Sequence, residues 1–132
     1  MKRITILATL ILLSLAAAAQ ADNAACLSFH TGTFAYRNDS LGIIQITRTK
    51  NRQEELNEKT RVLTKFKITW VDACTYTLKQ IWSNSKKQRK QNNSLNTIII
   101  TAATKDSYQF SCSCTNDPGG KNNSGTVVRI FY

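Results

Sequence analysis

The single histidine is the first residue to weigh as a catalyst. His30 stands near the beginning of a predicted strand, in a chain of 132 residues. Acid–base or nucleophilic catalysis by histidine needs a nucleophile and an orienting carboxylate within hydrogen-bond reach. No GxSxG, HExxH, phosphate-binding loop or dinucleotide-binding motif occurs in the sequence. We therefore interpret His30 as a surface or strand-start residue and predict no catalytic residue and no enzymatic activity.

A cluster of glutamates is the second candidate for acid–base chemistry. Glu54, Glu55 and Glu58 lie in one short segment that continues with Lys59 and Arg61. Carboxyl groups with different environments can serve as an acid and a base. Carboxylates on a short turn beside cations are more typical of solvated surface charge, and this is the interpretation that we prefer.

Four cysteines, Cys26, Cys74, Cys112 and Cys114, are candidates for disulfides or for metal ligation. An even number in an exported chain indicates disulfides, with three connectivities available. Cys112 and Cys114 are two apart on a predicted strand, so they share a face but do not easily bridge each other, and the sequence leaves their state open. We prefer Cys26–Cys74, which would tie down the N-terminal segment and contribute roughly 3–4 kcal/mol. A zinc site built from these cysteines and His30 has poor ligand spacing, and we predict no metal and no cofactor.

The strongest concentration of charge lies in a segment without apolar residues, 83–94. Such a segment attracts phosphate or sulfate polymers and anionic lipid surfaces. It has no aromatic residue for base stacking, so we expect no specific nucleic acid partner. The alternative is a loop that only aids solubility. The residues of this candidate anion contact are Lys86, Lys87, Arg89 and Lys90.

The N-terminus has the three parts of a signal peptide. Lys2 and Arg3 precede an apolar run over 4–15, and Ala19-Gln20-Ala21 fits the cleavage rule for small residues. The apolar run is shorter than the roughly 20 residues that a spanning helix needs. We predict a signal peptide at 1–21, cleavage before Asp22, and export to the periplasm or the cell exterior. No transmembrane segment is expected after cleavage.

The mature chain then covers 22–132 and forms one domain of a size that can bury a working core. It keeps 16 basic and 8 acidic residues, a net charge of about +8. Its partners are unknown from the sequence, and an anionic polymer or envelope surface fits this charge.

The clearest strand pattern is a hairpin between Lys65 and Trp82. Apolar and polar residues alternate on both sides of a turn, which gives each strand one buried face. A three-residue loop, 71–73, places both apolar sets on the same face. We expect Asp72 to accept hydrogen bonds from backbone N–H groups of that turn. The predicted register pairs Trp70 with Cys74, Ile68 with Tyr76, Phe66 with Leu78 and Val62 with Trp82, and it sets Lys65 opposite Lys79.

The remaining segments also indicate strands joined by short links, and no helix is expected after the signal peptide. The segment 53–59 has a helix-forming composition but is too short to bury much as a helix, so we interpret it as a strand. Residues 115–125 are a turn-rich loop. The prediction is an all-β meander of about eight antiparallel strands, either a small up-and-down, lipocalin-like barrel or a strongly curved sheet, with a two-sheet sandwich as the alternative. The strands are expected at 32–37, 41–50, 53–59, 61–71, 74–83, 95–104, 107–114 and 126–132.

A closed sheet of this size either fills its interior with side chains or encloses one small ligand. Residues on the expected inner face would then form an apolar pocket, although a simple core is the commoner outcome. The candidate lining residues are Phe66, Ile68, Trp70, Tyr76, Leu78, Trp82, Tyr108 and Phe110.

Several motifs together resemble a family of small exported all-β proteins of Bacteroidota-type bacteria. They are Cys26 with F-x-T-G-x-F at 29–34, Arg48 near a strand end, QEE at 53–55, W-x-D-x-C-x-Y-x-L at 70–78 and S-Y-x-F at 107–110. The resemblance implies a structural Cys26–Cys74 pair. Cys112, Cys114 and the KKQRK run depart from the family pattern. Some members are labelled DNA topoisomerase IV, but an exported chain of this length has no room for the nucleotide, metal and DNA-cleaving sites of that enzyme.

These observations predict a non-enzymatic binding or interaction module of the periplasm or cell exterior. One alternative is a lipocalin-like carrier of a small apolar ligand. Another is a basic inhibitor or adhesion factor that contacts anionic partners through the 86–90 segment.

Overall fold

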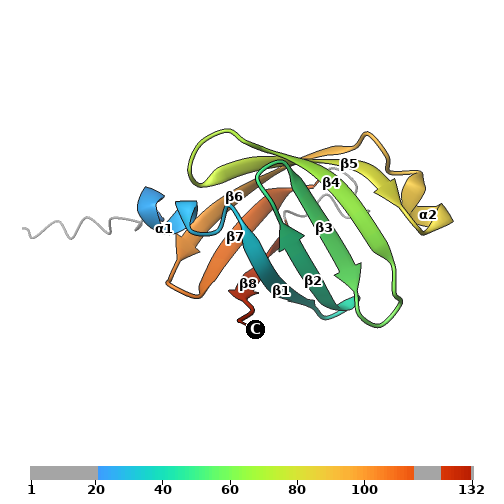
Figure 1. Ribbon diagram of the computed structural model, residues 1–132, viewed down its shortest axis with the longest axis horizontal. Coiled ribbons are helices and arrows are strands. Elements are labelled where there is room, and N and C mark those ends of the chain that lie inside the picture. Colours follow the sequence, from blue (N-terminus) through green and yellow to red (C-terminus); the bar gives the residue numbers. More distant parts are fainter. Residues whose placement is uncertain (1–20, 115–122, 132) are drawn as a thin grey trace, which may run out of the picture.

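Eight antiparallel strands form a closed barrel in which each strand pairs with the next along the chain (Figure 1). The computed structural model describes residues 21–114 and 123–131. The predicted barrel is confirmed, in preference to the open sheet and the sandwich. The strands are β1 (Gly32–Asn38), β2 (Gly42–Arg48), β3 (Arg52–Asn57), β4 (Leu63–Trp70), β5 (Thr75–Ser83), β6 (Leu95–Ala103), β7 (Ser107–Ser113) and β8 (Asn123–Arg129).

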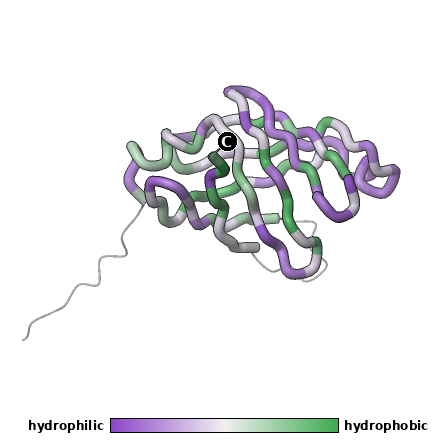
Figure 2. Tube along the Cα trace, turned by 60° about the horizontal axis from the view of Figure 1, so that its bottom comes forward, coloured by the Kyte–Doolittle hydropathy of each residue, from purple (hydrophilic) through white to green (hydrophobic). Residues whose placement is uncertain are grey.

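The alternation of side chains explains why these segments form a barrel with one inner face. Hydrophilic and hydrophobic residues alternate along the strands, and hydrophilic residues prevail at the hairpin ends (Figure 2). Residues two apart share a face of a strand, so one set from each strand points inward. The residues buried most completely in the interior include Phe34, Ile68, Tyr108 and Val127.

Pairing of the last strand with the first closes the barrel. Phe34 lies opposite Arg129, and Tyr36 lies opposite Val127. Gly125, on β8, makes this closure possible because a Cβ there would fall 2.5 Å from a ring carbon of Tyr36. A larger residue at this position would force the Tyr36 ring out of the barrel wall.

The β4–β5 hairpin is present, but its predicted register is wrong by two residues. Trp70 pairs with Tyr76, and Ile68 pairs with Leu78. Five residues, 71–75, therefore separate Trp70 from Tyr76, and the last of them, Thr75, already belongs to β5; the predicted loop had three residues, 71–73. A shift of two leaves every side chain on its expected face, so the alternation alone could not reveal the error. The expected role of Asp72 is confirmed, because its Oδ1 accepts the Cys74 N–H at 2.9 Å.

A bulge farther along the same hairpin overturns the prediction for Trp82. Phe66 pairs with Gln80, while Lys65 pairs with Trp82, so Ile81 is an extra residue on β5. An extra residue reverses the facing of everything beyond it. Trp82 is consequently 41% exposed on the outer wall, where the Lys65 ammonium lies 5.5 Å from its ring centroid.

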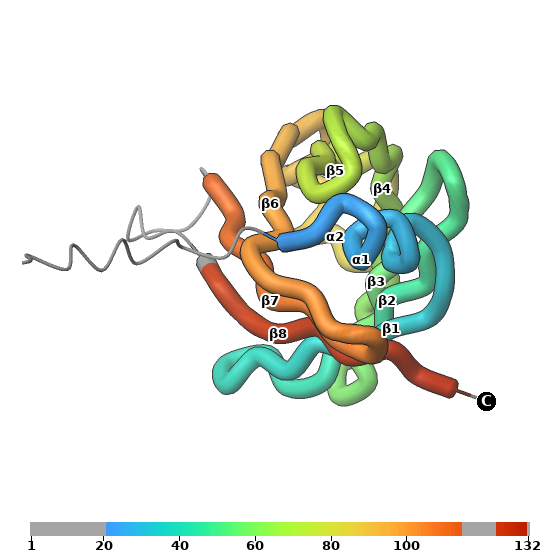
Figure 3. Tube along the Cα trace, turned by 90° about the vertical axis from the view of Figure 1, so that its left-hand side faces the viewer, coloured from blue at the N-terminus to red at the C-terminus, as the bar shows by residue number. Residues whose placement is uncertain are grey.

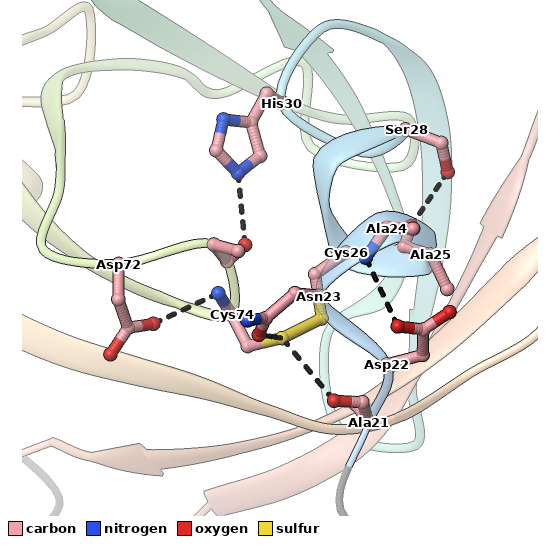
Figure 4. The surroundings of a disulfide bond; sticks show 11 residues. Ala21, Asp22, Asn23, Ala24, Ala25, Cys26, Ser28, His30, Asp72 and Cys74 are labelled. Atoms are coloured by element: carbon pink, nitrogen blue, oxygen red, sulfur yellow. Dashed lines mark hydrogen bonds between the residues drawn. A yellow bond between two sulfur atoms is a disulfide. The ribbon is translucent and has the colours of Figure 1, made fainter.

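One end of the barrel is covered by the N-terminal segment. Helix α1 (Asn23–Leu27) and the residues after it cross this end in Figure 3. Phe29 is fully buried there and packs edge-on against Tyr108, with ring centroids 5.0 Å apart. The predicted Cys26–Cys74 disulfide is confirmed and ties the segment to the β4–β5 turn (Figure 4).

The second disulfide corrects the expectation that the remaining cysteines do not easily bridge, since Cys112 and Cys114 bond to each other. Residues two apart on an extended strand are about 6.6 Å apart, near the upper limit for a disulfide. Strand β7 ends at Ser113, and the chain contracts beyond it, so the two Cα atoms are 5.3 Å apart.

Two short helices, α1 and α2 (Lys86–Arg89), correct the expectation that no helix follows the signal peptide. The predicted strand at 53–59 is confirmed as β3. Within the described ranges, no helix is long and apolar enough to cross a membrane. The predicted signal peptide, except for Ala21, and most of the loop at 115–125 lie outside the described residues.

Candidate functional site

Arg48, the last residue of β2, is the centre of a polar network inside the barrel, at the end that α1 and the residues after it cover. We call this end of the interior the floor. The Arg48 side chain is 2% exposed. Its Nε donates a hydrogen bond to Gln53 Oε1 at 2.8 Å, and its Nη1 donates to the backbone oxygen of Phe29 at 2.8 Å. Its Nη2 donates to the hydroxyls of Tyr76 and Tyr108 at 3.2 and 3.0 Å. The guanidinium thus links the N-terminal segment that covers the barrel, through Phe29, to strands β3, β5 and β7.

Aromatic rings surround the same guanidinium. Its carbon lies 4.8 Å from the ring centroid of Tyr76 and 5.2 Å from that of Phe34. A cation over an aromatic face is attracted by the ring quadrupole, more strongly where water is excluded. The charge of Arg48 is therefore stabilised by neutral groups, with no direct carboxylate partner among the described residues.

The pKa shifts of Arg48 and Tyr76 keep Arg48 positively charged and Tyr76 neutral. Burial alone would lower the pKa of Arg48, but the electrostatic interactions and hydrogen bonds with Tyr76 and Tyr108 outweigh burial and raise it. Burial, followed by the neighbouring Tyr108, raises the pKa of Tyr76 well above its ordinary value. Tyr76 therefore remains a neutral hydroxyl, which accepts from arginine and can donate its own proton.

Glu55 continues the polar chain from the floor into the cavity. Gln53 accepts from Arg48 and donates from its Nε2 to Glu55 Oε1 at 2.7 Å. The register places Glu55 opposite Ile46 on the inner wall. Burial raises the pKa of Glu55, while the Gln53 hydrogen bond and the charge of Arg48 act to lower it. Some of its surface borders the cavity, although protein encloses the carboxyl group. The interpretation of Glu55 as solvated surface charge is wrong.

Above the floor the barrel holds a cavity of about 250 Å³. Its wall runs from Tyr76 and Tyr108 to Asn38, Leu41 and Cys114, at the end opposite α1. Glu55 is the acidic member of an otherwise mainly apolar lining. The lining residues are Tyr36, Asn38, Leu41, Ile44, Ile46, Gln53, Glu55, Phe66, Tyr76, Leu78, Asn96, Ile98, Tyr108, Phe110, Cys112, Cys114 and Val127.

Five of the eight predicted lining residues border this cavity: Phe66, Tyr76, Leu78, Tyr108 and Phe110. Ile68 and Trp70 do not, because they lie nearer the covered end and border an outer groove instead. Trp70 stacks on His30, with centroids 3.4 Å apart and planes at 13°. His30 also bonds through Nε2 to the backbone oxygen of Ala73 at 2.9 Å, so it is a strand-start residue with a structural role. Trp82 faces outward, as described above.

The predicted anion-contact residues lie in and next to α2, far from the covered end (Figure 1). All four side chains, Lys86, Lys87, Arg89 and Lys90, are exposed. Gln80, a buried residue of β5, donates to the backbone oxygen of Gln88 at 2.6 Å and so fixes the segment to the barrel. None of the four charges reaches the cavity.

From the sequence, Arg48 was noted only as part of the family resemblance, and Gln53 only as part of the QEE motif. A usable signal existed, since Ile44, Ile46 and Arg48 are two apart and must share a face. Polar residues at inward positions of an apolar set point to a buried polar network. In the described parts of the chain, no group of three or more histidine, cysteine or acidic side chains could hold a metal ion.

Comparison with known family models, characterised proteins and solved structures found no match to this chain. The resemblance to the exported all-β family stays a prediction.

Proposed function

We propose that the protein binds a small molecule in the barrel, and that the ligand has an apolar body and a polar end that faces Glu55. The observation that carries the proposal is the enclosed carboxyl group on the wall of an apolar cavity. A buried carboxyl with a raised pKa is destabilised when ionised. Gln53 supplies one hydrogen bond to this carboxyl group, and a ligand that donates to it would supply a second.

The tyrosine hydroxyls of the floor add a second polar contact. Tyr76 and Tyr108 have oxygens 3.3 Å apart, and one of them donates to the other. Arg48 donates to both, so the remaining hydroxyl proton has no acceptor among the described residues. The polar end of the ligand therefore both donates, to Glu55, and accepts, from a tyrosine. An alcohol or phenol has this combination.

The size of the cavity limits the ligand. A cavity of about 150 Å³ holds one benzene molecule. The cavity of about 250 Å³ in this barrel then fits roughly ten heavy atoms. We propose that the protein is a non-enzymatic carrier or sensor of such a compound. The two disulfides support a place outside the cytoplasm.

The matched pair p-cresol and p-xylene tests the proposal by isothermal titration, because the two differ only in a hydroxyl against a methyl group. The ratio of the affinity for p-cresol to the affinity for p-xylene should fall about tenfold in Glu55→Leu. This factor corresponds to the loss of one hydrogen bond to a charged group. Leu78→Trp, which fills the cavity, should abolish binding of both. Native mass spectrometry of the purified protein should detect a bound small molecule.

Circular dichroism must show that each variant keeps the barrel. No binding of either probe and no bound compound would rule out a ligand-binding interior. Binding of both probes with an unchanged affinity ratio in Glu55→Leu would rule out Glu55 as the anchor.

A further inference from the structure

A row of three cations crosses the outer wall of the barrel. Arg52 on β3 lies opposite Lys67 on β4, and Lys67 lies opposite Lys79 on β5. All three side chains are exposed. Neighbouring strands are about 4.8 Å apart, so the three charges stand side by side on a rigid surface. We call Arg52, Lys67 and Lys79 the cationic row.

Among residues 21–114 and 123–131, no carboxylate forms an ion pair with this row. The ion pair found among the described residues joins Lys65 to Glu54, at 3.1 Å, and lies in the next row along the same strands. Like charges directly opposite each other destabilise a sheet. The cationic row therefore costs stability in the free protein, and an anion bound across the three strands would remove that cost.

A groove beside the row extends the same surface toward the covered end. It has a volume of about 510 Å³ and is lined in part by Lys67, Thr69 and the stacked pair of His30 and Trp70. Lys50, in the β2–β3 turn, contributes a fourth exposed cation to the groove. The positive surface thus continues past the cationic row into a concave site.

A row of hydroxyl groups runs parallel to the cationic row. Thr69 lies opposite Thr77, and Thr77 lies opposite Thr97, two residues farther along each strand. Threonine hydroxyls both donate and accept hydrogen bonds. The outer wall of β4 and β5 therefore presents charge and hydroxyl groups in adjacent rows, which match a polymer that carries both anionic groups and hydroxyls.

We propose that the cationic row and the adjoining groove bind an acidic polysaccharide. The row itself has no aromatic side chain, and Trp70 in the groove is already stacked on His30, which disfavours the base stacking that single-stranded nucleic acid uses. In line with the row, a membrane surface would meet Leu95, the exposed residue opposite Lys79. The exposed Ile81 and Ile99 lie on the same two strands but outside the row, whereas membrane-surface binding relies on a continuous apolar face. This site is separate from the cavity and does not depend on the ligand proposed above.

The experiment compares two variants that remove equal charge from different places. The row variant is Arg52→Gln/Lys67→Gln/Lys79→Gln, and the control is Lys86→Gln/Lys87→Gln/Lys90→Gln. Binding of a heparin decasaccharide is titrated between about 50 and 200 mM salt. Each lost ionic contact lowers the slope of log K against log salt by about one. We expect the magnitude of this slope to decrease by two to three in the row variant and by less than one in the control.

Several outcomes would overturn the proposal. Equal losses in the two variants would mean that net charge alone attracts heparin, and a larger loss in the control would move the site to the α2 segment. Absence of heparin binding by the unaltered protein would exclude the site. Tighter binding of oligothymidylate or of phosphatidylserine vesicles would assign the row to a different class of partner. If the row variant does not fold, Lys67→Gln alone must show the largest loss among single substitutions.

Discussion

Positive charge is hydrogen-bonded in the interior of the barrel and, in the part of the chain that the structure describes, unpaired on part of its outer wall. Arg48, inside, donates to four acceptors and lies among aromatic rings. Lys67, outside, lies between two other cations and has no ion pair among the described residues. Burial forces the first charge to be satisfied within the fold. Exposure allows the second to remain unpaired.

This difference separates a charge that the fold needs from charges that the fold merely tolerates. Arg48 joins the covering segment to three strands, so its position is explained by stability alone. The cationic row lowers stability, and an arrangement that costs stability is a reason to look for a binding role. Glu55 stands between the two cases, because it is enclosed and has one neutral partner, Gln53.

The largest effect is expected from removing the interior charge. Arg48→Met keeps much of the side-chain volume but removes the arginine donor from the buried acceptors on Phe29, Gln53 and the two tyrosines. Breaking such a network typically costs about 3–5 kcal/mol. Urea unfolding followed by tryptophan fluorescence should show the midpoint moving to lower urea, by this loss of free energy divided by the m-value.

Arg37→Met is the matched control, because Arg37 is exposed on β1. Its effect should stay within about 0.5 kcal/mol. If both variants unfold at the same urea concentration, the interior charge is not structural and the contrast between the two regions is lost.

The barrel could be predicted because its main determinant is local. Alternation over six to nine residues assigns each strand an inner face, and short links favour pairing with the next strand. The β4–β5 register could not be predicted, because a shift of two residues preserves every facing. The bulge at Ile81 could not be predicted either, and it alone decides that Trp82 faces outward.

The two candidate sites were hidden for different reasons. Arg48 and Glu55 occupy inward positions that the alternation indicates, but the charge of Glu55 favoured an assignment to the surface, and Arg48 entered only through the family resemblance. The cationic row is assembled from three strands, and only the true register brings Lys67 opposite Lys79. The predicted register set Lys65 there. The sequence instead drew attention to the segment 86–90, where the charges are consecutive in the chain.

An intermediate effect is expected at Glu55. Its raised folded pKa means that the native state binds a proton more tightly than the unfolded chain does, for which the glutamate pKa is about 4.3. Stability must then fall as the pH rises from about 4.3 through the folded pKa of Glu55. Glu55→Gln should remove this fall and raise stability at neutral pH by about 1 kcal/mol.

Urea midpoints measured from pH 4 to pH 8 check this prediction, with Glu54→Gln as the control, since Glu54 pairs with Lys65 on the outer wall. If Glu55→Gln keeps the same fall with pH, another group is responsible. A variant that becomes more stable and also loses the preference for p-cresol would place Glu55 with the residues that serve binding at the expense of stability.

The smallest effect tests the outer wall directly. Lys67→Gln removes the middle charge of the cationic row and should raise stability by a few tenths of a kcal/mol at low salt, because two repulsions disappear. Salt at about 1 M shortens the screening length to about 3 Å and should cancel the gain. Lys65→Gln, on the same strand and face, breaks an ion pair instead and should lower stability by a similar amount. At low salt, the thermal midpoint should therefore rise for Lys67→Gln and fall for Lys65→Gln relative to the unaltered protein, and both shifts should shrink at about 1 M salt. If both variants lose stability, Lys67 has a favourable partner in the free protein, and the case for an anion-binding row fails.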